Sequence, residues 1–241
     1  MGVSTAIVKR VGGRAAGPAI EEISNRLAVV TRRAIDTVVR TRAQAIAADA
    51  DIFRLQHPGL DQAGLERALI RDRARKGGVA GLASGLPSIV AGPGTVLEIA
   101  AAIGDAAAVT YTEVSLILQI AHLRGHDVSD VEGRRLEVLL TLGLHSGAVK
   151  IKDGELRSGA QRLDPAHLED LPDEVVGAIN RELAELVIMK FARRRAAMLA
   201  GRLVPLGIGV AVAGVEDFRS VGAVGKSARK FFDLVDAARV A

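Results

Sequence analysis

Polar side chains recur along one apolar stretch at a spacing that could support acid–base chemistry. Glu98, Asp105, Thr112, Gln119 and His126 follow one another at intervals of seven residues. A heptad drifts by only about 20° around an α-helix, so these side chains would form one slowly turning stripe. Carboxylates and an imidazole are the groups that general acid–base catalysis uses.

Ordinary structural roles account for most of this stripe. Glu98 completes a helix-capping pattern that begins at Thr95, in which each side chain satisfies a backbone amide. We interpret the rest as a solvated or partner-facing stripe, and Asp105 is the one carboxylate that merits a catalytic test. The candidate polar stripe comprises Asp105, Thr112 and Gln119.

Metal and nucleotide motifs are incomplete. His122 and His126 have the spacing of two metal ligands, but Gly125 lies between them and ends the helix that would align them. The string SVGAVGKS, residues 220–227, has Ser220 where a P-loop requires glycine. In GLHSG, residues 143–147, the serine is displaced by one place from that of a nucleophile elbow. We predict no metal, no cofactor and no catalytic residue, and we do not favour an enzyme.

The elements that must position these residues are helical. Apolar residues recur at helical spacing over residues 19–48, and further helices are expected over 61–76, 95–125, 172–201 and 219–240. A second capping pattern, beginning at Ser129, opens a helix that ends near His145. Asp153-Gly154 lies between short apolar alternations, where a small hairpin fits but is not required. These patterns predict an all-α fold: a single mainly helical domain over residues 19–241 with a long central helix, after a flexible segment over residues 1–18.

Composition narrows the class of partner. The chain has 241 residues, 49% of them hydrophobic, yet only five Phe, one Tyr and no Trp, so Ala, Val, Leu and Ile must form the core. It has no cysteine and a net charge of +4, which suits an anionic partner. Nucleic acid is disfavoured because the aromatic platforms that stack on bases are missing. We expect a cytoplasmic protein.

Two glycine-rich apolar segments stand out. Residues 77–97 carry no charge and contain six glycines, and residues 202–215 form a second such segment. Two prolines argue against a membrane-spanning helix over the first segment, whereas glycines every four residues leave one helix face open to a close neighbour. We predict two apolar hairpins, buried or shallowly inserted, with Gly77, Gly81, Gly85, Gly207 and Gly209 as packing glycines.

Basic residues precede each of these segments. Clusters of cations beside apolar segments suit an anionic bilayer surface, although two solvated helix faces explain them equally well. The residues predicted to make this contact are Arg67, Arg71, Arg73, Arg75 and Lys76 before the first segment, and Lys190, Arg193, Arg194, Arg195 and Arg202 around the start of the second.

Three stretches resemble the EcsC protein family: GGVAGLASGLP at residues 77–87, LQIAHLRGHD at 118–127, and RLVPLGIGVAVAGVEDFRSVGAVGKSARKFF at 202–232. In that family a small-residue segment ending in Gly-Leu-Pro precedes a helix that closes with a Gly-Asp turn, and a later glycine-rich stretch leads into a final helix. This chain departs from the family pattern at Arg124 and His126 and at residues 215–217. The resemblance implies a fold and a membrane-side role, and it supplies no catalytic residue.

Two functions remain open from the sequence. The first is a non-enzymatic protein that docks on the inner face of the cytoplasmic membrane or on a membrane protein such as a transporter, through its basic clusters. The second is a soluble helical module that binds an apolar ligand, such as a lipid, or a protein partner between the glycine-rich hairpins. The sequence leaves the oligomeric state open.

Overall fold

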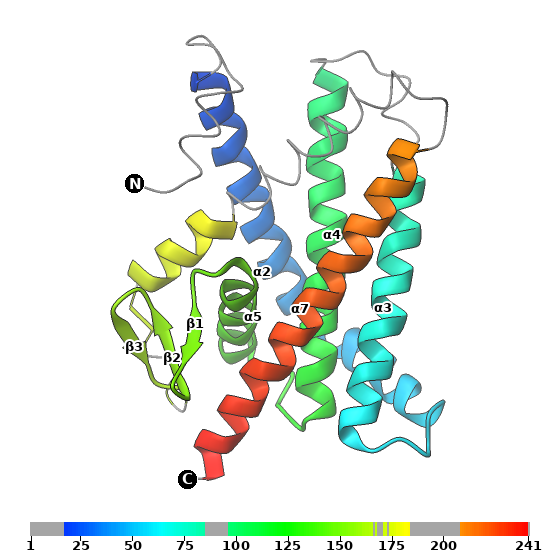
Figure 1. Ribbon diagram of the computed structural model, residues 1–241, viewed down its shortest axis with the longest axis vertical. Coiled ribbons are helices and arrows are strands. Elements are labelled where there is room, and N and C mark those ends of the chain that lie inside the picture. The colour runs from blue at the N-terminus through cyan, green and yellow to red at the C-terminus, as the bar shows by residue number, and fades with distance from the viewer. Residues whose placement is uncertain are drawn as a thin grey trace.

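Long helices packed side by side form most of the molecule (Figure 1). The computed structural model describes residues 17–84, 96–165, 167, 171–172, 174–183 and 208–240. They form α2 (Gly17–Leu55), α3 (Gln62–Ser84), α4 (Val96–Leu123), α5 (Val131–Ser146) and α7 (Ile208–Val240), together with helical residues 174–183. The expected all-α, mainly helical fold is confirmed. The flexible segment predicted at the N-terminus lies outside the described residues, except that Gly17 and Pro18 begin α2.

α4 is the central helix, as predicted. Between Val114 and Ala121 nearly every side chain is buried, whichever way it points, which is typical of a helix surrounded by others. α2 packs along one side of α4, and α3 and α7 pack against each other and against α4. In Figure 1, α7 crosses in front of α4 and runs antiparallel to α3.

A three-stranded antiparallel sheet flanks α5. It consists of β1 (Lys150–Lys152), β2 (Glu155–Ser158) and β3 (Gln161–Leu163), in that spatial order. The predicted turn at Asp153-Gly154 joins β1 to β2, and both residues have positive φ, 54° and 78°, as a two-residue hairpin turn requires. Leu156 of β2 and Leu163 of β3 point into the core. The third strand was not predicted from the sequence.

Helix ends follow local backbone chemistry. At the end of α4, Gly125 has φ 85°, its amide donates to His122 O, and the His126 amide donates to Ala121 O. These two bonds form a Schellman motif, and they confirm the predicted stop at Gly125. The prediction of the next helix start was wrong by one residue. Asp130 caps α5 by accepting from the Gly133 amide, while Ser129 instead bonds to Asp127.

The second glycine-rich segment also differs from its prediction over its described part. From Ile208 onward it is continuous with the predicted last helix, and together they form the 33 residues of α7. Glycine lowers helix stability without blocking the helix, and no proline interrupts this part of the chain. The predicted turns of both hairpins lie outside the described residues. Among the described helices, none combines the length and apolarity that crossing a bilayer requires.

Candidate functional site

Exposed arginines form a row along α3. Arg67, Arg71 and Arg75 recur every four residues, which places them on one side of the helix. All three are exposed, and within the described part of the chain none has an ion-pair partner. Their charges are therefore available to an external anion.

A second row of cations lies on α7. Arg219, Lys226 and Lys230 are exposed and, like the α3 row, have no ion-pair partner among the described residues. This row was not predicted from the sequence, because its cations follow the second glycine-rich segment rather than precede it. The four-residue spacing of Lys226 and Lys230, with Arg219 seven residues before Lys226, could have indicated it.

Both rows lie on the same outer side of the α3–α7 pair. Ile70 of α3 packs against Gly225 of α7, and the residues just before them, Leu69 and Val224, are fully buried. The residues just after them, Arg71 and Lys226, are exposed. Each residue turns a helix by about 100°, so Arg71 and Lys226 are each rotated by about 100° from the line where the two helices touch. Because α3 and α7 are antiparallel, these equal rotations bring both side chains to the same side of the helix pair. We call this surface the α3–α7 basic face, and it comprises Arg67, Arg71, Arg75, Arg219, Lys226 and Lys230.

Apolar side chains adjoin one end of this face. Phe218 is 42% exposed and Val215 is 49% exposed, and both precede Arg219 on α7. Val215 lies four residues before Arg219 and so on the same side of the helix. At the opposite end, the exposed Asp233 is already bonded to Arg124 at 2.8 Å. The α3–α7 basic face therefore joins positive charge to exposed apolar surface at one end.

Two members of the predicted α3 cluster differ from this row. The Arg73 side chain is only 20% exposed, lies 3.3 Å from Asp72, and donates from Nε to Gln119 Oε1 over 2.9 Å. Lys76 is exposed but pairs with Asp72 at 2.9 Å. The structure thus separates a cluster of five cations into three with no described partner and two that are bonded within the protein.

The predicted polar stripe on α4, expected to be solvated or partner-facing, is only partly exposed where its side chains are described. Gln119 is buried and holds Arg73, and Thr112 is half-buried and donates to Ala108 O over 3.1 Å. His126 is buried as well. Gln119 and His126 differ from the predicted solvated stripe because α4 lies at the centre of the bundle, where polar residues meet other helices. Asp105 lies within α4, and its side chain lies outside the described set.

The structure describes three of the five glycines that were predicted to pack helices closely. Gly81 lies within α3 and Gly209 within α7, while Gly77 packs directly against α7: a Cβ built on it would lie 3.1 Å from Val221 Cγ2. Close helix packing at Gly77 is therefore confirmed. The residues that lie outside the described part of the chain are Gly85, Lys190, Arg193, Arg194, Arg195, Arg202 and Gly207.

A buried ion network joins α3, α4 and α7. Glu66 is fully buried and accepts two hydrogen bonds from Arg124, over 2.7 and 2.9 Å, and one from Arg229 over 2.9 Å. Arg124 also donates to Asp236 over 3.1 Å. Burial alone would raise the pKa of Glu66, but hydrogen bonds from Arg124, Gln62 and Arg229 and the charge of Arg124 outweigh it and lower the pKa. For Arg124, burial acts to lower the pKa, and its carboxylate partners outweigh this and raise it.

His126 extends the network to α5. Its Nδ1 lies 2.7 Å from Glu137 Oε1 and its Nε2 lies 2.9 Å from Asp236 Oδ1. Glu137 also bonds to Arg134, and the His126 ring meets Phe232 edge to face at 5.0 Å.

These charges hold one another rather than forming an open site. A cluster of ionisable groups is a candidate site for acid–base chemistry, but Glu66, Arg124 and His126 each bond within the network. Among the described residues, no group of His, Asp and Glu has the arrangement of a metal site. We interpret the network as the element that fixes the lower ends of α3, α4, α5 and α7 to one another (Figure 1).

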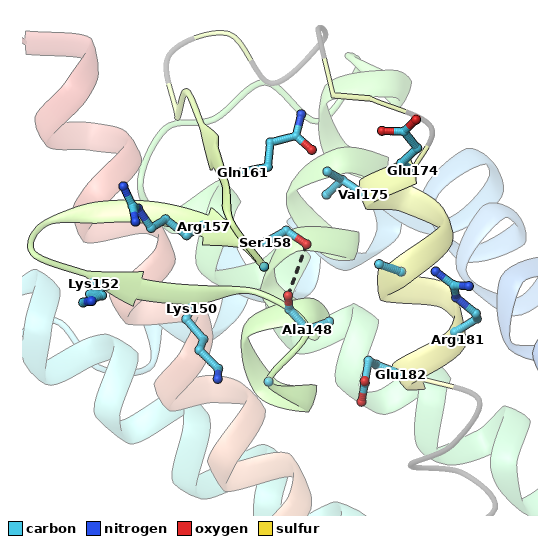
Figure 2. A pocket seen from close by; sticks show the side chains of 13 residues that line it. Ala148, Lys150, Lys152, Arg157, Ser158, Gln161, Glu174, Val175, Arg181 and Glu182 are labelled. Atoms are coloured by element: carbon cyan, nitrogen blue, oxygen red, sulfur yellow. Dashed lines mark hydrogen bonds between the residues drawn. The ribbon is translucent and has the colours of Figure 1, made fainter. Parts of the chain in front are cut away.

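A groove lies where the sheet meets helical residues 174–183 (Figure 2). Its volume is about 790 Å³. Lys150, Lys152 and Arg157 line its sheet side, and Glu174, Arg181 and Glu182 line its helix side. The sequence analysis did not predict it, because its two walls are brought together only by the fold.

Comparison of this chain with models of protein families, with curated proteins and with solved structures finds no match. The resemblance to the EcsC family therefore rests on the quoted residues alone.

Proposed function

We propose that this protein docks peripherally on an anionic membrane surface through the α3–α7 basic face. The observation that carries the proposal is the gathering of six exposed cations, none with an ion-pair partner in the described structure, on one side of two packed helices. A Lys or Arg near an anionic bilayer contributes about 1 kcal/mol. Several such residues acting together would give reversible binding that salt weakens.

Phe218 and Val215 would add an apolar contact at one end of the face. Burying a large apolar side chain contributes about 1.5–3 kcal/mol, and both side chains are already partly exposed. A membrane surface offers charge and apolar depth together, whereas an acidic soluble protein need not. The membrane-side role implied by the EcsC resemblance agrees with this assignment and forms part of the proposal.

Vesicle co-sedimentation tests the proposal. We expect the wild-type chain to bind vesicles containing phosphatidylserine at low salt, to dissociate at high salt, and to ignore vesicles of phosphatidylcholine alone. The variant K226E/K230E should lose most of this binding, since it reverses two charges of the face. The matched control R33E/R42E reverses two exposed arginines on α2 and should bind like wild type.

Two outcomes would overturn the proposal. One is an absence of wild-type binding to anionic vesicles at low salt, in protein whose far-UV circular dichroism shows the helical fold. The other is an equal loss of binding in K226E/K230E and R33E/R42E, which would mean that net charge rather than this face determines attraction.

A further inference from the structure

The groove beside the sheet has the make-up of a binding site separate from the α3–α7 basic face. In Figure 2 it opens between β1 and β2 on one side and helical residues 174–183 on the other. Its floor includes Ala148, Val175 and Ala178, whose short side chains leave the space open. Ser158 Oγ donates to Ala148 O over 3.3 Å, which ties the end of β2 to the start of β1.

Two glycines at its edge have backbones that other residues rarely adopt. Gly147 has φ 91° and Gly159 has φ 59°, and both line the groove. A Cβ built on either would meet no atom within 4 Å. The backbone of these two turns is therefore exposed at the groove, with no side chain over it.

The sheet wall of the groove is cationic. In the antiparallel register Lys150 lies opposite Arg157 and Lys152 lies opposite Glu155, and opposed residues share one face of a sheet. Glu155 is bonded to Arg157 at 3.2 Å and to Arg162 at 3.1 Å. Lys150 and Lys152 line the groove and have no ion-pair partner in the described part of the structure, so no ion pair compensates these two charges.

The helix wall has a different character. It presents Glu174 and Glu182 together with Arg181, and none of the three pairs with another described residue. Two carboxylates on this wall would repel an anionic bilayer. A small ligand can instead place phosphate against the lysines and hydroxyl groups against the carboxylates, because hydroxyls donate to carboxylate oxygens.

We infer that this groove binds a small phosphorylated polyol or sugar, with its phosphate groups at Lys150 and Lys152 and its hydroxyls at Glu174 and Glu182. A volume of about 790 Å³ is within the range of small-molecule sites. The same chemistry occurs in free sugar phosphates and in phosphoinositide headgroups. The inference does not depend on the membrane function proposed above.

Isothermal titration calorimetry with inositol 1,4,5-trisphosphate tests the inference. We expect one site per chain, weaker binding of inorganic phosphate, and no binding of unphosphorylated inositol. K150A/K152A should lower the affinity at least tenfold, because it removes both uncompensated cations. E174Q/E182Q should reduce the preference for inositol trisphosphate over inorganic phosphate.

The control K226A/K230A removes two lysines from the α3–α7 basic face and should bind inositol trisphosphate like wild type, whether or not it binds vesicles. Because these substitutions change exposed side chains, circular dichroism should show each variant folded. Vesicles containing a phosphoinositide distinguish a lipid headgroup from a free ligand as the source. The inference is overturned if wild type binds neither inositol trisphosphate nor phosphate, or if K150A/K152A binds as tightly as K226A/K230A.

Discussion

Ile70 occupies the space that a side chain at Gly225 would need. A Cβ built on Gly225 would lie 2.6 Å from Ile70 Cγ1 and 2.8 Å from its Cγ2. Seven residues along α3, the roles are exchanged, and Gly77 receives Val221 of α7. A large side chain against a glycine on each helix lets the two backbones approach closely, and this packing sets the orientation of the α3–α7 basic face.

Replacing Gly225 by alanine should therefore destabilise the protein. The β-branched Ile70 cannot move its γ carbons without shifting the helix, and overpacking of this kind costs about 1–3 kcal/mol. The gain in helix propensity on replacing glycine is about 1 kcal/mol at most. We expect urea denaturation to show a lower free energy of unfolding for G225A.

Gly222 provides the matched control in the same helix. A Cβ there would meet nothing within 4 Å, so G222A should raise the free energy of unfolding by about 1 kcal/mol through helix propensity alone. In an I70A background, the same G225A substitution should cost less free energy of unfolding, because the γ carbons that the new Cβ would meet are gone. Equal effects of G225A and G222A would contradict the packing argument.

The buried Glu66 should make stability sensitive to acid. Its pKa is lowered in the folded protein from the ordinary value of 4.5, so its ionised form stabilises the fold above pH 4.5. That contribution declines as the pH falls below 4.5 through the folded pKa. E66Q should cost about 3–5 kcal/mol near neutrality, since it removes the fully buried carboxylate that pairs with Arg124 and Arg229.

The difference between wild type and E66Q should shrink in urea titrations below pH 4.5. Glu132 is the control, because its pair with Arg40, at 3.4 Å, is exposed on both sides. E132Q should change stability by about 1 kcal/mol or less, with no comparable loss in acid. A constant difference between wild type and E66Q down to pH 3 would refute the role of Glu66 ionisation.

His126 should contribute more to stability than the half-buried His57. H126A would remove one partner from Glu137, which still bonds to Arg134, and one from Asp236, which still bonds to Arg124. Each lost hydrogen bond to a charged group costs about 1.5–3 kcal/mol. His57 hydrogen-bonds to a single backbone carbonyl, Phe53 O, over 2.8 Å. H57A should cost about 0.5–1.5 kcal/mol, and chemical denaturation of both variants at one pH compares them. A loss from H126A no larger than that from H57A would rule out a central role for His126.

The sequence was sufficient to predict those features of the fold that depend on a few neighbouring residues. Gly125 ends α4 and Asp153-Gly154 turns the hairpin because each backbone conformation is decided within a few residues. Gly77 could be predicted as a packing position, since its small size is itself the signal. The third strand was missed because a segment of three residues carries little periodicity.

The buried network could not be predicted from the sequence. Glu66 meets Arg124 from 58 residues away and Arg229 from 163 residues away, and no local pattern encodes such a pairing. Each residue alone resembles a solvated charge on a helix. The same limit applies to the α3–α7 basic face, because periodicity places each row on its own helix but only the contact of Ile70 with Gly225 places both rows on one side.

Arg71 and Arg73 lie two residues apart, and we expect their substitution to affect different properties: membrane binding for Arg71 and stability for Arg73. Arg71 is exposed, whereas Arg73 donates to the buried Gln119 over 2.9 Å. R71A should weaken binding to phosphatidylserine vesicles several-fold, as expected from about 1 kcal/mol per charge, and should leave the urea midpoint unchanged. R73A should lower the midpoint, at a cost of about 1–3 kcal/mol for an unsatisfied buried partner, and should retain more vesicle binding than R71A. If both variants bind equally weakly and remain equally stable, the two arginines act as one solvated cluster and the division drawn from their contacts is wrong.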